Sequence, residues 1–316
     1  MSSVQDHPVP QDPPVFFGGH ETFPFRYGWL KKGVDAVSHR HTFFSSDSAM
    51  IRLGVGKNMV KSIKHWCLAT NLIQPATDNT VARTRTSYVP SEIGKALFAD
   101  SGFDPFLEDL ATLWLLHWQL ASTPNLSTMW FWLFNHWHGV EFTKEQVFSE
   151  IQKWLRRANA KTVSDSQLKR DIDCCVRCYL HSTQNKEVVN EDSFDCPLSE
   201  LGLLVEIQDG RTYQFRRGEQ PGLPMEILLY ALNEFCQKEK STATSVALSR
   251  LLTDVGSPGK VFKLDEASLV RRLEEIETIS DGVFAYGESA NIKQIYRRRD
   301  VSSFLWLNKY YQRRTV

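Results

Sequence analysis

Apolar positions between residues 47 and 98 follow the spacing of two helices, a hairpin and a third helix. Gly54 and Gly56 interrupt the first helical stretch and predict a tight turn. The apolar residues that then recur on one helical face are Val60, Ile63, Cys67 and Leu72. Asp78-Asn79 lies between two β-prone stretches, as is typical of a hairpin, and Ser91 can open a short last helix. Helix, turn, helix and hairpin is the order of elements in a winged helix-turn-helix, which the sequence predicts here.

Two further parts of the chain show a similar order of elements. The very hydrophobic residues 103–140 predict two packed helices. Thr143 and Gln146 then form a capping-box pattern before an amphipathic helix, and Asp209-Gly210 marks the tip of a later hairpin. The last hundred residues repeat the order with PMEILLYALNEFCQK, DEASLVRRLEEIE and VFAYGESANIKQIYRRR. We therefore expect a mainly α protein with small β-hairpin wings, built from two to three winged-helix-like units.

The order of elements also suggests a division into domains. We expect a disordered leader at 1–15, a winged-helix domain with a Trp-rich helical pair at 16–140, a second winged-helix-like unit at 141–222 and a third at 223–316.

Composition narrows the class of protein. The chain has 316 residues, of which 42% are hydrophobic and 23% charged, as in ordinary globular proteins. No apolar run reaches the roughly 18–20 residues of a membrane span, and the first residues lack a signal-peptide pattern. The six cysteines show no disulfide framework, so we expect a cytoplasmic protein with free thiols and no membrane partner. The formal net charge is zero, so any affinity for a polyanion must come from local patches.

Such a patch coincides with the first predicted unit. Between Met50 and Ala96 there are seven Lys or Arg residues and two acidic residues, a local excess of 7 − 2 = 5 positive charges. A helix that enters the DNA major groove places its first residues on base edges and its cations on phosphates. The candidate DNA-binding residues are Arg52, Lys57, Asn58, Lys61, Lys64, Arg83 and Arg85. Solvated surface cations are the alternative, but the helix-turn-helix pattern favours DNA.

Long segments of the chain resemble a known bacterial family. The segments that carry the resemblance are GGHETFPFRYGWLKKG, LGVGKNMVKSIKHW, GFDPFLEDLATLWLLHW, EDSFDCPLSELGL and SPGKVFKLDE. From about residue 16 to about residue 310 the chain resembles the SspB-type family, a former domain of unknown function from single-strand DNA phosphorothioation systems. The resemblance implies a DNA-binding component of an anti-phage modification system that nicks one strand so that sulfur can enter. It implies a cysteine desulfurase, an ATPase and a sulfur-transferring enzyme as partners. A non-catalytic DNA-binding scaffold and a transcriptional regulator of the same system remain as alternatives.

Catalytic residues for a nick are harder to find. The sequence contains no PD-(D/E)xK or HNH arrangement. A metal-dependent endonuclease would use carboxylates around Mg²⁺ or Mn²⁺, but the sequence does not identify the metal ligands. One candidate group is His20, Glu21 and Arg26, which could act as base, metal ligand and phosphate clamp. The other candidate group is Asp104, Glu108, Asp109 and His117, in which Asp104 and Glu108 would lie one turn apart on a helix.

Each of these groups also has a structural interpretation. Glu21 can open a helix, while Asp104 before Pro105 can cap one, and a histidine on an apolar helix is more often a core residue. Cys175 and Cys178, with Cys196 and His181 nearby in sequence, could hold zinc, but the spacing lacks a second pair and favours buried thiols. We therefore do not expect zinc.

Overall fold

The computed structural model of the chain describes residues 15–76, 86–124, 126–160, 162–181, 196–207, 210–238, 245–289 and 292–313. Helices dominate these residues, and the strands form one two-stranded and two three-stranded antiparallel sheets. The predicted mainly α fold with small β-hairpins is therefore confirmed. The leader predicted at 1–15 lies outside the described residues, except for Val15.

The first region contains the two helices with a turn between them, the two strands and the short last helix predicted from the sequence. Its elements are α1 (Trp29–His39), η1 (Phe43–Ser45), α2 (Ala49–Leu53), α3 (Lys57–Ala69), β1 (Ile73–Pro75), β2 (Tyr88–Pro90) and α4 (Glu92–Phe98). Gly54 ends α2 with φ 67°, a left-handed conformation that glycine adopts without strain. The apolar face of α3 packs on α1, and the Ser91 hydroxyl accepts a hydrogen bond from Gly94 N at the start of α4.

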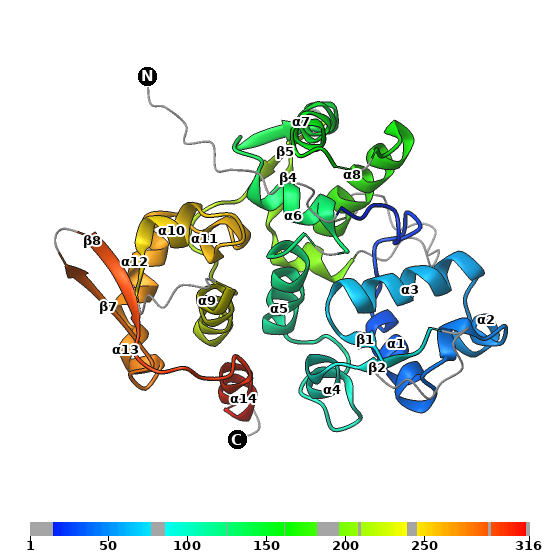
Figure 1. The fold of residues 1–316 in the computed structure, drawn as a ribbon, viewed down its shortest axis with the longest axis horizontal. Helices are drawn as coiled ribbons and strands as arrows, with labels where there is room; N and C mark the ends of the chain where they lie inside the picture. Colours follow the sequence, from blue (N-terminus) through cyan, green and yellow to red (C-terminus); the bar gives the residue numbers. More distant parts are fainter. Residues whose placement is uncertain are drawn as a thin grey trace.

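Two helices, α5 (Leu110–Ala121) and α6 (Thr128–Asn135), lie at the centre of the molecule (Figure 1). Ten of the twelve residues of α5 and all eight of α6 are buried. A helix that is apolar on all sides is stable only when other elements cover every face. Accordingly, α5 contacts α6, α9 and η3, and α6 contacts α8 and α11.

The second region follows α6 directly. Its elements are β3 (Glu141–Thr143), α7 (Lys144–Arg157), α8 (Asp165–Tyr179), η3 (Pro197–Leu201), β4 (Leu204–Glu206) and β5 (Thr212–Phe215). The predicted capping box is present, because Thr143 Oγ1 accepts from Gln146 N and Gln146 Oε1 accepts from Thr143 N. In the sheet, β5 lies between β3 and β4, and Phe142 is opposite Tyr213. Asp209, expected at the hairpin tip, lies outside the described residues.

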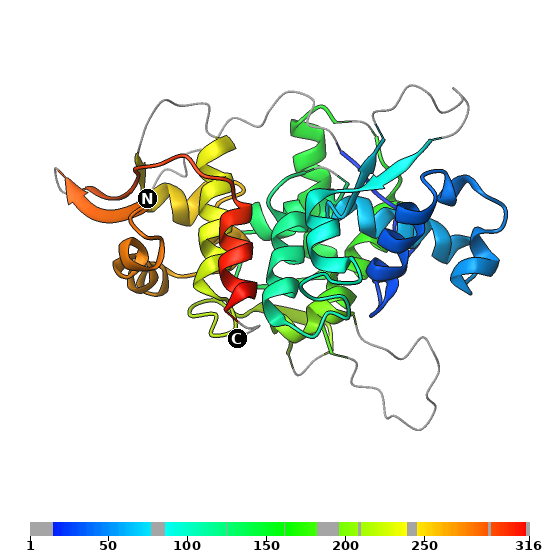
Figure 2. The same ribbon diagram turned by 90° about the horizontal axis from the view of Figure 1, so that it is seen from below.

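The third region begins with a buried helix. Its elements are α9 (Met225–Lys238), β6 (Ser245–Ala247), α10 (Leu248–Thr253), α11 (Pro258–Val261), α12 (Glu266–Glu274), α13 (Ile276–Ile279), β7 (Phe284–Ser289), β8 (Ile292–Arg297) and α14 (Phe304–Gln312). The longest hairpin, β7–β8, projects from one end of the molecule (Figure 2). The last helix, α14, returns to pack on α9.

The two three-stranded sheets share one connectivity. The strand order β3-β5-β4 is repeated as β6-β8-β7, so in both sheets the last strand lies in the middle. In the first region Tyr88 N donates to His41 O, which places residue 41 beside β2 where the other sheets have their first strand. This common order supports the predicted repetition, while the domain boundaries at 140 and 222 stay a prediction.

One continuous hydrophobic core joins the three regions. The regions are arranged around α5 and α6 (Figure 1). Among the described residues, no helix combines the length and the apolar character that crossing a bilayer requires.

Candidate nucleic-acid interface

Helix α3 has one buried face and one cationic face. Val60, Ile63 and Cys67 are buried, whereas Lys57, Asn58 and Lys61 are exposed. Arg52, at the end of α2, is also exposed. No acidic residue lies in the first turn of α3, so no side chain there offsets the positive end of the helix dipole. The surface formed by Arg52, Lys57, Asn58 and Lys61 is called the α3 face below.

The remaining candidate DNA-binding residues differ in their contacts. Lys61 Nζ lies 3.1 Å from Glu21 Oε1, in an ion pair that is partly exposed. Lys64 is half-buried, with its ammonium 6.0 Å from the centre of the Tyr88 ring. Within the described ranges, neither Arg52 nor Lys57 has an ion-pair partner. Arg83 and Arg85 lie outside the described residues.

His20 lies in a buried aromatic cluster beside α3. It is 1% exposed, and its ring contacts those of His65, Trp66 and Trp130. His20 Nδ1 accepts a hydrogen bond from Thr22 N, and Nε2 lies 3.3 Å from Asp171 Oδ2. The loop that holds His20 is therefore fixed to the second region through α8.

The pKa values of His20, Cys174 and His65 are shifted by burial and by contacts between residues far apart in the sequence. Burial alone would lower the pKa of His20, but its interactions with Asp171 and Cys174 outweigh burial and raise the pKa to about 10. Burial would raise the pKa of Cys174, but its contacts with Cys178 and His20 outweigh that effect and lower the pKa to about 6. Burial, together with the nearby His20 and Lys64 charges, lowers the pKa of His65 to about 3. Contacts with Asp171 and Cys174 therefore favour the charged form of His20, whereas burial favours the neutral form of His65.

The first candidate catalytic group does not converge on one point. His20 faces Asp171, Glu21 pairs with Lys61, and the Arg26 guanidinium lies 5.4 Å from the centre of the Trp29 ring. His20 Nδ1 accepts from Thr22 N and Nε2 faces Asp171, so neither ring nitrogen is free to act as a general base. The catalytic assignment of these three residues stays a prediction that substitution must test.

The second candidate group forms a turn and does not lie on a helix. Helix α5 begins at Leu110 with Asp109 as its N-cap, so the expectation that Asp104 and Glu108 share a helix is wrong. Asp104 is not the N-cap either. Its carboxylate accepts hydrogen bonds from Glu108 N (2.8 Å), Asp109 N (3.2 Å) and Thr112 Oγ1 (2.5 Å). These donors make Asp104 the centre of a tight turn, and only Glu108 of the three acids is exposed.

His117 lies apart from that turn in its hydrogen bonding. Its Nδ1 is 2.7 Å from Tyr179 Oη and its Nε2 is 2.9 Å from Val261 O. The side chain is fully buried, and burial lowers its pKa to about 3. These contacts join α5 to α8 and α11, as expected of a core histidine.

The cysteines are buried free thiols. Cys175 and Cys178 lie on α8, and burial raises the pKa of both thiols well above the usual value. In the part of the chain that the structure describes, no group of three or more His, Cys, Asp or Glu side chains is arranged to hold a metal ion.

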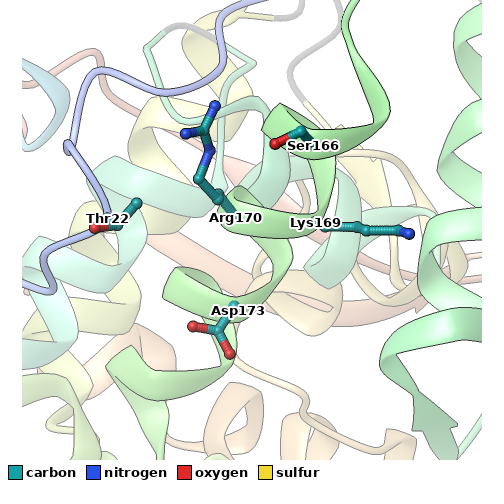
Figure 3. Close-up of a pocket in the computed structure, with 5 residues that line it drawn as sticks. All are labelled: Thr22, Ser166, Lys169, Arg170 and Asp173. Carbon is teal, nitrogen blue, oxygen red and sulfur yellow. The ribbon is translucent and has the colours of Figure 1, made fainter.

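A surface cavity of about 450 Å³ lies between α8 and the loop that carries His20 (Figure 3). Its lining residues are Thr22, Ser166, Lys169, Arg170 and Asp173. Asp173 is paired with Lys144 at 2.6 Å and with Arg177 at 2.9 Å, while Lys169 and Arg170 are exposed. Sequence reasoning missed this cavity and Asp171, because only the tertiary structure brings α8 against the loop.

The fold and the α3 face define a mainly helical protein with a cationic helix-turn-helix. The chain belongs to the family described as "Protein of unknown function (DUF4007)", whose model matches residues 17–311. Among solved structures it is similar to one titled "SspB crystal structure", with a TM-score of 0.85 and 28% identity over 96% of this chain and 89% of that chain. It is also similar to a "Magnesium ion-bound SspB crystal structure", with a TM-score of 0.85 and 26% identity over 97% and 91%. A search of curated proteins found no match. The family resemblance predicted from the sequence is therefore confirmed.

Proposed function

We propose that this protein binds DNA through the α3 face. The observation that carries the proposal is the exposed set Lys57, Asn58 and Lys61 on a helix whose opposite face is buried. This is the arrangement of a recognition helix, in which packing orients the helix and the free face contacts bases and phosphates.

The contacts of the loop that carries His20 extend this proposed surface to α8. Lys61 of α3 pairs with Glu21, and Arg177 of α8 donates to Thr22 O at 2.5 Å. Cations from both helices therefore hold adjacent residues of one loop. Arg170 extends towards this loop, while Lys169 points the other way along the cavity, with its ammonium 5.2 Å from the centre of the Phe148 ring (Figure 3). A DNA backbone that crosses α3 would next meet the cavity on α8.

The proposed biological role is that of a DNA phosphorothioation protein that nicks one strand. It rests on the similarity to SspB structures and on the sequence motifs that resemble the SspB-type family. The predicted partners are a cysteine desulfurase, an ATPase and a sulfur-transferring enzyme. The magnesium-bound SspB structure makes Mg²⁺ the first metal to test, followed by Mn²⁺.

The candidate residues do not by themselves assemble a metal centre. Glu108 is exposed and Glu21 is half-buried, whereas Asp104 and Asp109 are buried and hydrogen-bonded. Among the described residues, no three or more His, Cys, Asp or Glu side chains are grouped so that they could hold a metal ion.

Two assays test the binding and the cutting separately. Gel-shift titration of duplex DNA should show binding that is weakened by Lys57→Ala together with Lys61→Ala. Lys153→Ala is the matched control, because Lys153 is an exposed lysine already paired with Glu150. Conversion of supercoiled plasmid to the nicked form with Mg²⁺ or Mn²⁺ should decrease in the variants that bind DNA more weakly. A protein that binds DNA but leaves the plasmid intact with either metal, alone and with its partners, would contradict the nickase.

A non-catalytic DNA-binding scaffold is the second candidate. The observation that favours it is that His20, Asp104 and His117 are buried and engaged in structural contacts. The scaffold would bind DNA in the gel shift and recruit modification enzymes without relaxing plasmid. A transcriptional regulator would instead protect one discrete operator, without need of a metal.

A further inference from the structure

A second cationic site lies between the second and third regions, away from the α3 face. It is a cavity of about 200 Å³, and its lining comes from the residues after α6, the residues after β5, the end of α10 and the segment at α11. Its polar lining includes His138, Arg217, Lys260 and Lys263. Lys260 and Lys263 belong to the SPGKVFKLDE motif, to which the DNA-binding proposal gives no role.

The three cations of this cavity bond to neutral groups. Lys263 is 4% exposed, and its ammonium donates to Phe134 O at 2.7 Å and lies 4.2 Å from the centre of the Phe215 ring. Lys260 Nζ donates to Asn135 O at 2.9 Å, and Arg217 donates to Gly139 O at 3.2 Å. Among the described residues no carboxylate lines the cavity, and Asp254, the acid that acts on Lys260, is paired with Arg250 at 2.8 Å.

The buried charge of Lys263, with Lys260 half-buried and Arg217 exposed beside it, is costly without a counter-charge. Burial lowers the pKa of Lys263 well below its usual value, and the neighbouring Arg217 and Lys260 charges lower it further. The backbone at Lys263 is also left-handed, with φ 56°, a strained conformation for a lysine. The Lys263 carbonyl accepts a hydrogen bond from Gly218 N, so the residue after Arg217 is bonded to the segment that carries Lys260 and Lys263. The fold therefore maintains an arrangement that repels itself unless an anion is present.

We propose that this cavity binds a phosphate group. Three cations surround one space, Arg217 from the residues after β5 and Lys260 and Lys263 from the segment at α11. The planar Arg217 guanidinium suits the paired oxygens of a phosphate. The volume is below the roughly 300–1,000 Å³ of sites for drug-sized ligands, so it accommodates a single phosphate group without a nucleoside. Inorganic phosphate and the terminal phosphate of a DNA strand share this chemistry.

The first experiment is calorimetric titration of the full chain with inorganic phosphate. Arg217→Gln and Lys260→Gln, made singly, should each raise the dissociation constant about tenfold, the effect of removing one charge-assisted hydrogen bond. Arg217 is exposed, so its variant is expected to fold, and thermal unfolding of each variant verifies that. Lys153→Gln is the matched control and should leave phosphate affinity unchanged.

The second experiment distinguishes the two sources of phosphate. A duplex with a nick that carries a 5′-phosphate is compared with the same duplex carrying a 5′-hydroxyl, in the wild type and in Arg217→Gln. A preference for the 5′-phosphate that disappears in Arg217→Gln supports a DNA end as the source. Binding of inorganic phosphate without such a preference supports the free anion.

The proposal is overturned if neither inorganic phosphate nor the 5′-phosphate binds, or if both folded variants bind as the wild type does. The combined Lys57→Ala and Lys61→Ala variant separates this proposal from the DNA-binding function. That variant should lose duplex affinity and keep its affinity for inorganic phosphate. The α3 face and the phosphate site can therefore fail independently.

Discussion

His20 and Asp171 form a buried pair that joins the first region to the second, with Nε2 and Oδ2 3.3 Å apart and side chains 1% and 2% exposed. Asp171 also accepts from Gly18 N at 3.0 Å and from Gln167 Nε2 at 2.5 Å. The carboxylate thus fixes the loop to α8 at two points, Gly18 and His20. Because Glu21 and Thr22 of this loop contact Lys61 and Arg177, the pair also sets the relative position of the cations proposed to bind DNA.

Loss of either partner should destabilise the whole fold. Removing one partner of a buried ion pair leaves an uncompensated charge and costs about 3–5 kcal/mol. We expect Asp171→Asn to lower the free energy of unfolding by about 3 kcal/mol in urea titration. Asp173→Asn, two residues along α8 and half-exposed, is the control and should cost less than about 1 kcal/mol. Equal stabilities of these two variants would show that the pair contributes nothing.

The same pair should make stability depend on pH in the alkaline range. The pKa of His20 is about 10 in the folded chain and about 6.5 in an unfolded chain. The folded state therefore binds the proton more tightly, so the contribution is complete below pH about 6.5 and is lost as pH rises through 10. We expect His20→Gln to show a flatter stability profile than the wild type between about pH 7 and about pH 10. Parallel profiles would contradict a charged His20.

Lysines of the α3 face should control the salt dependence of DNA binding. A variant that makes one phosphate contact fewer should show a slope of log K against log salt that is smaller by about one. We expect Lys57→Ala and Lys61→Ala each to lower affinity and to flatten the slope, measured by fluorescence anisotropy from about 50 to about 200 mM salt. Lys61→Ala should have the smaller effect, because Glu21 already neutralises part of its charge. A slope identical to that of Lys153→Ala would remove these lysines from the interface.

The candidate catalytic residues should separate into structural and accessible groups. His117→Ala removes a buried ring that bonds to Tyr179 and Val261, and we expect a loss of about 2–4 kcal/mol in the free energy of unfolding. Glu108→Ala changes an exposed side chain and should alter stability by less than about 0.5 kcal/mol. Plasmid nicking at a temperature where both variants are folded then tests catalysis. Full activity in His117→Ala would remove His117 from the candidates, and an inactive, folded Glu108→Ala would identify a catalytic carboxylate.

The helices and hairpins could be predicted from the sequence because their causes are local. Thr143 and Gln146 cap α7 within four residues of chain, and Val60, Ile63 and Cys67 define the buried face of α3 by spacing alone. The turn at Asp104 could not be predicted, since the sequence around Asp104 and Pro105 is equally compatible with the first turn of a helix. Hydrogen bonds from Glu108 N, Asp109 N and Thr112 Oγ1 decide in favour of the turn.

The sequence by itself determined the mainly α fold, the repeated order of elements and the cationic character of α3, because periodicity, capping and local charge are properties of short segments. Only the tertiary structure decided which side chains meet. His20 and Asp171 are 151 residues apart in the sequence, and Arg217 is far along the chain from Lys260, yet each set shares one site. Contacts between elements raise the pKa of His20, and the packing of elements gathers the cations around the phosphate-sized cavity. Neither the raised pKa of His20 nor the grouping of these cations can be predicted from a short segment of sequence. Both arise from the way separate helices pack around α5 and α6.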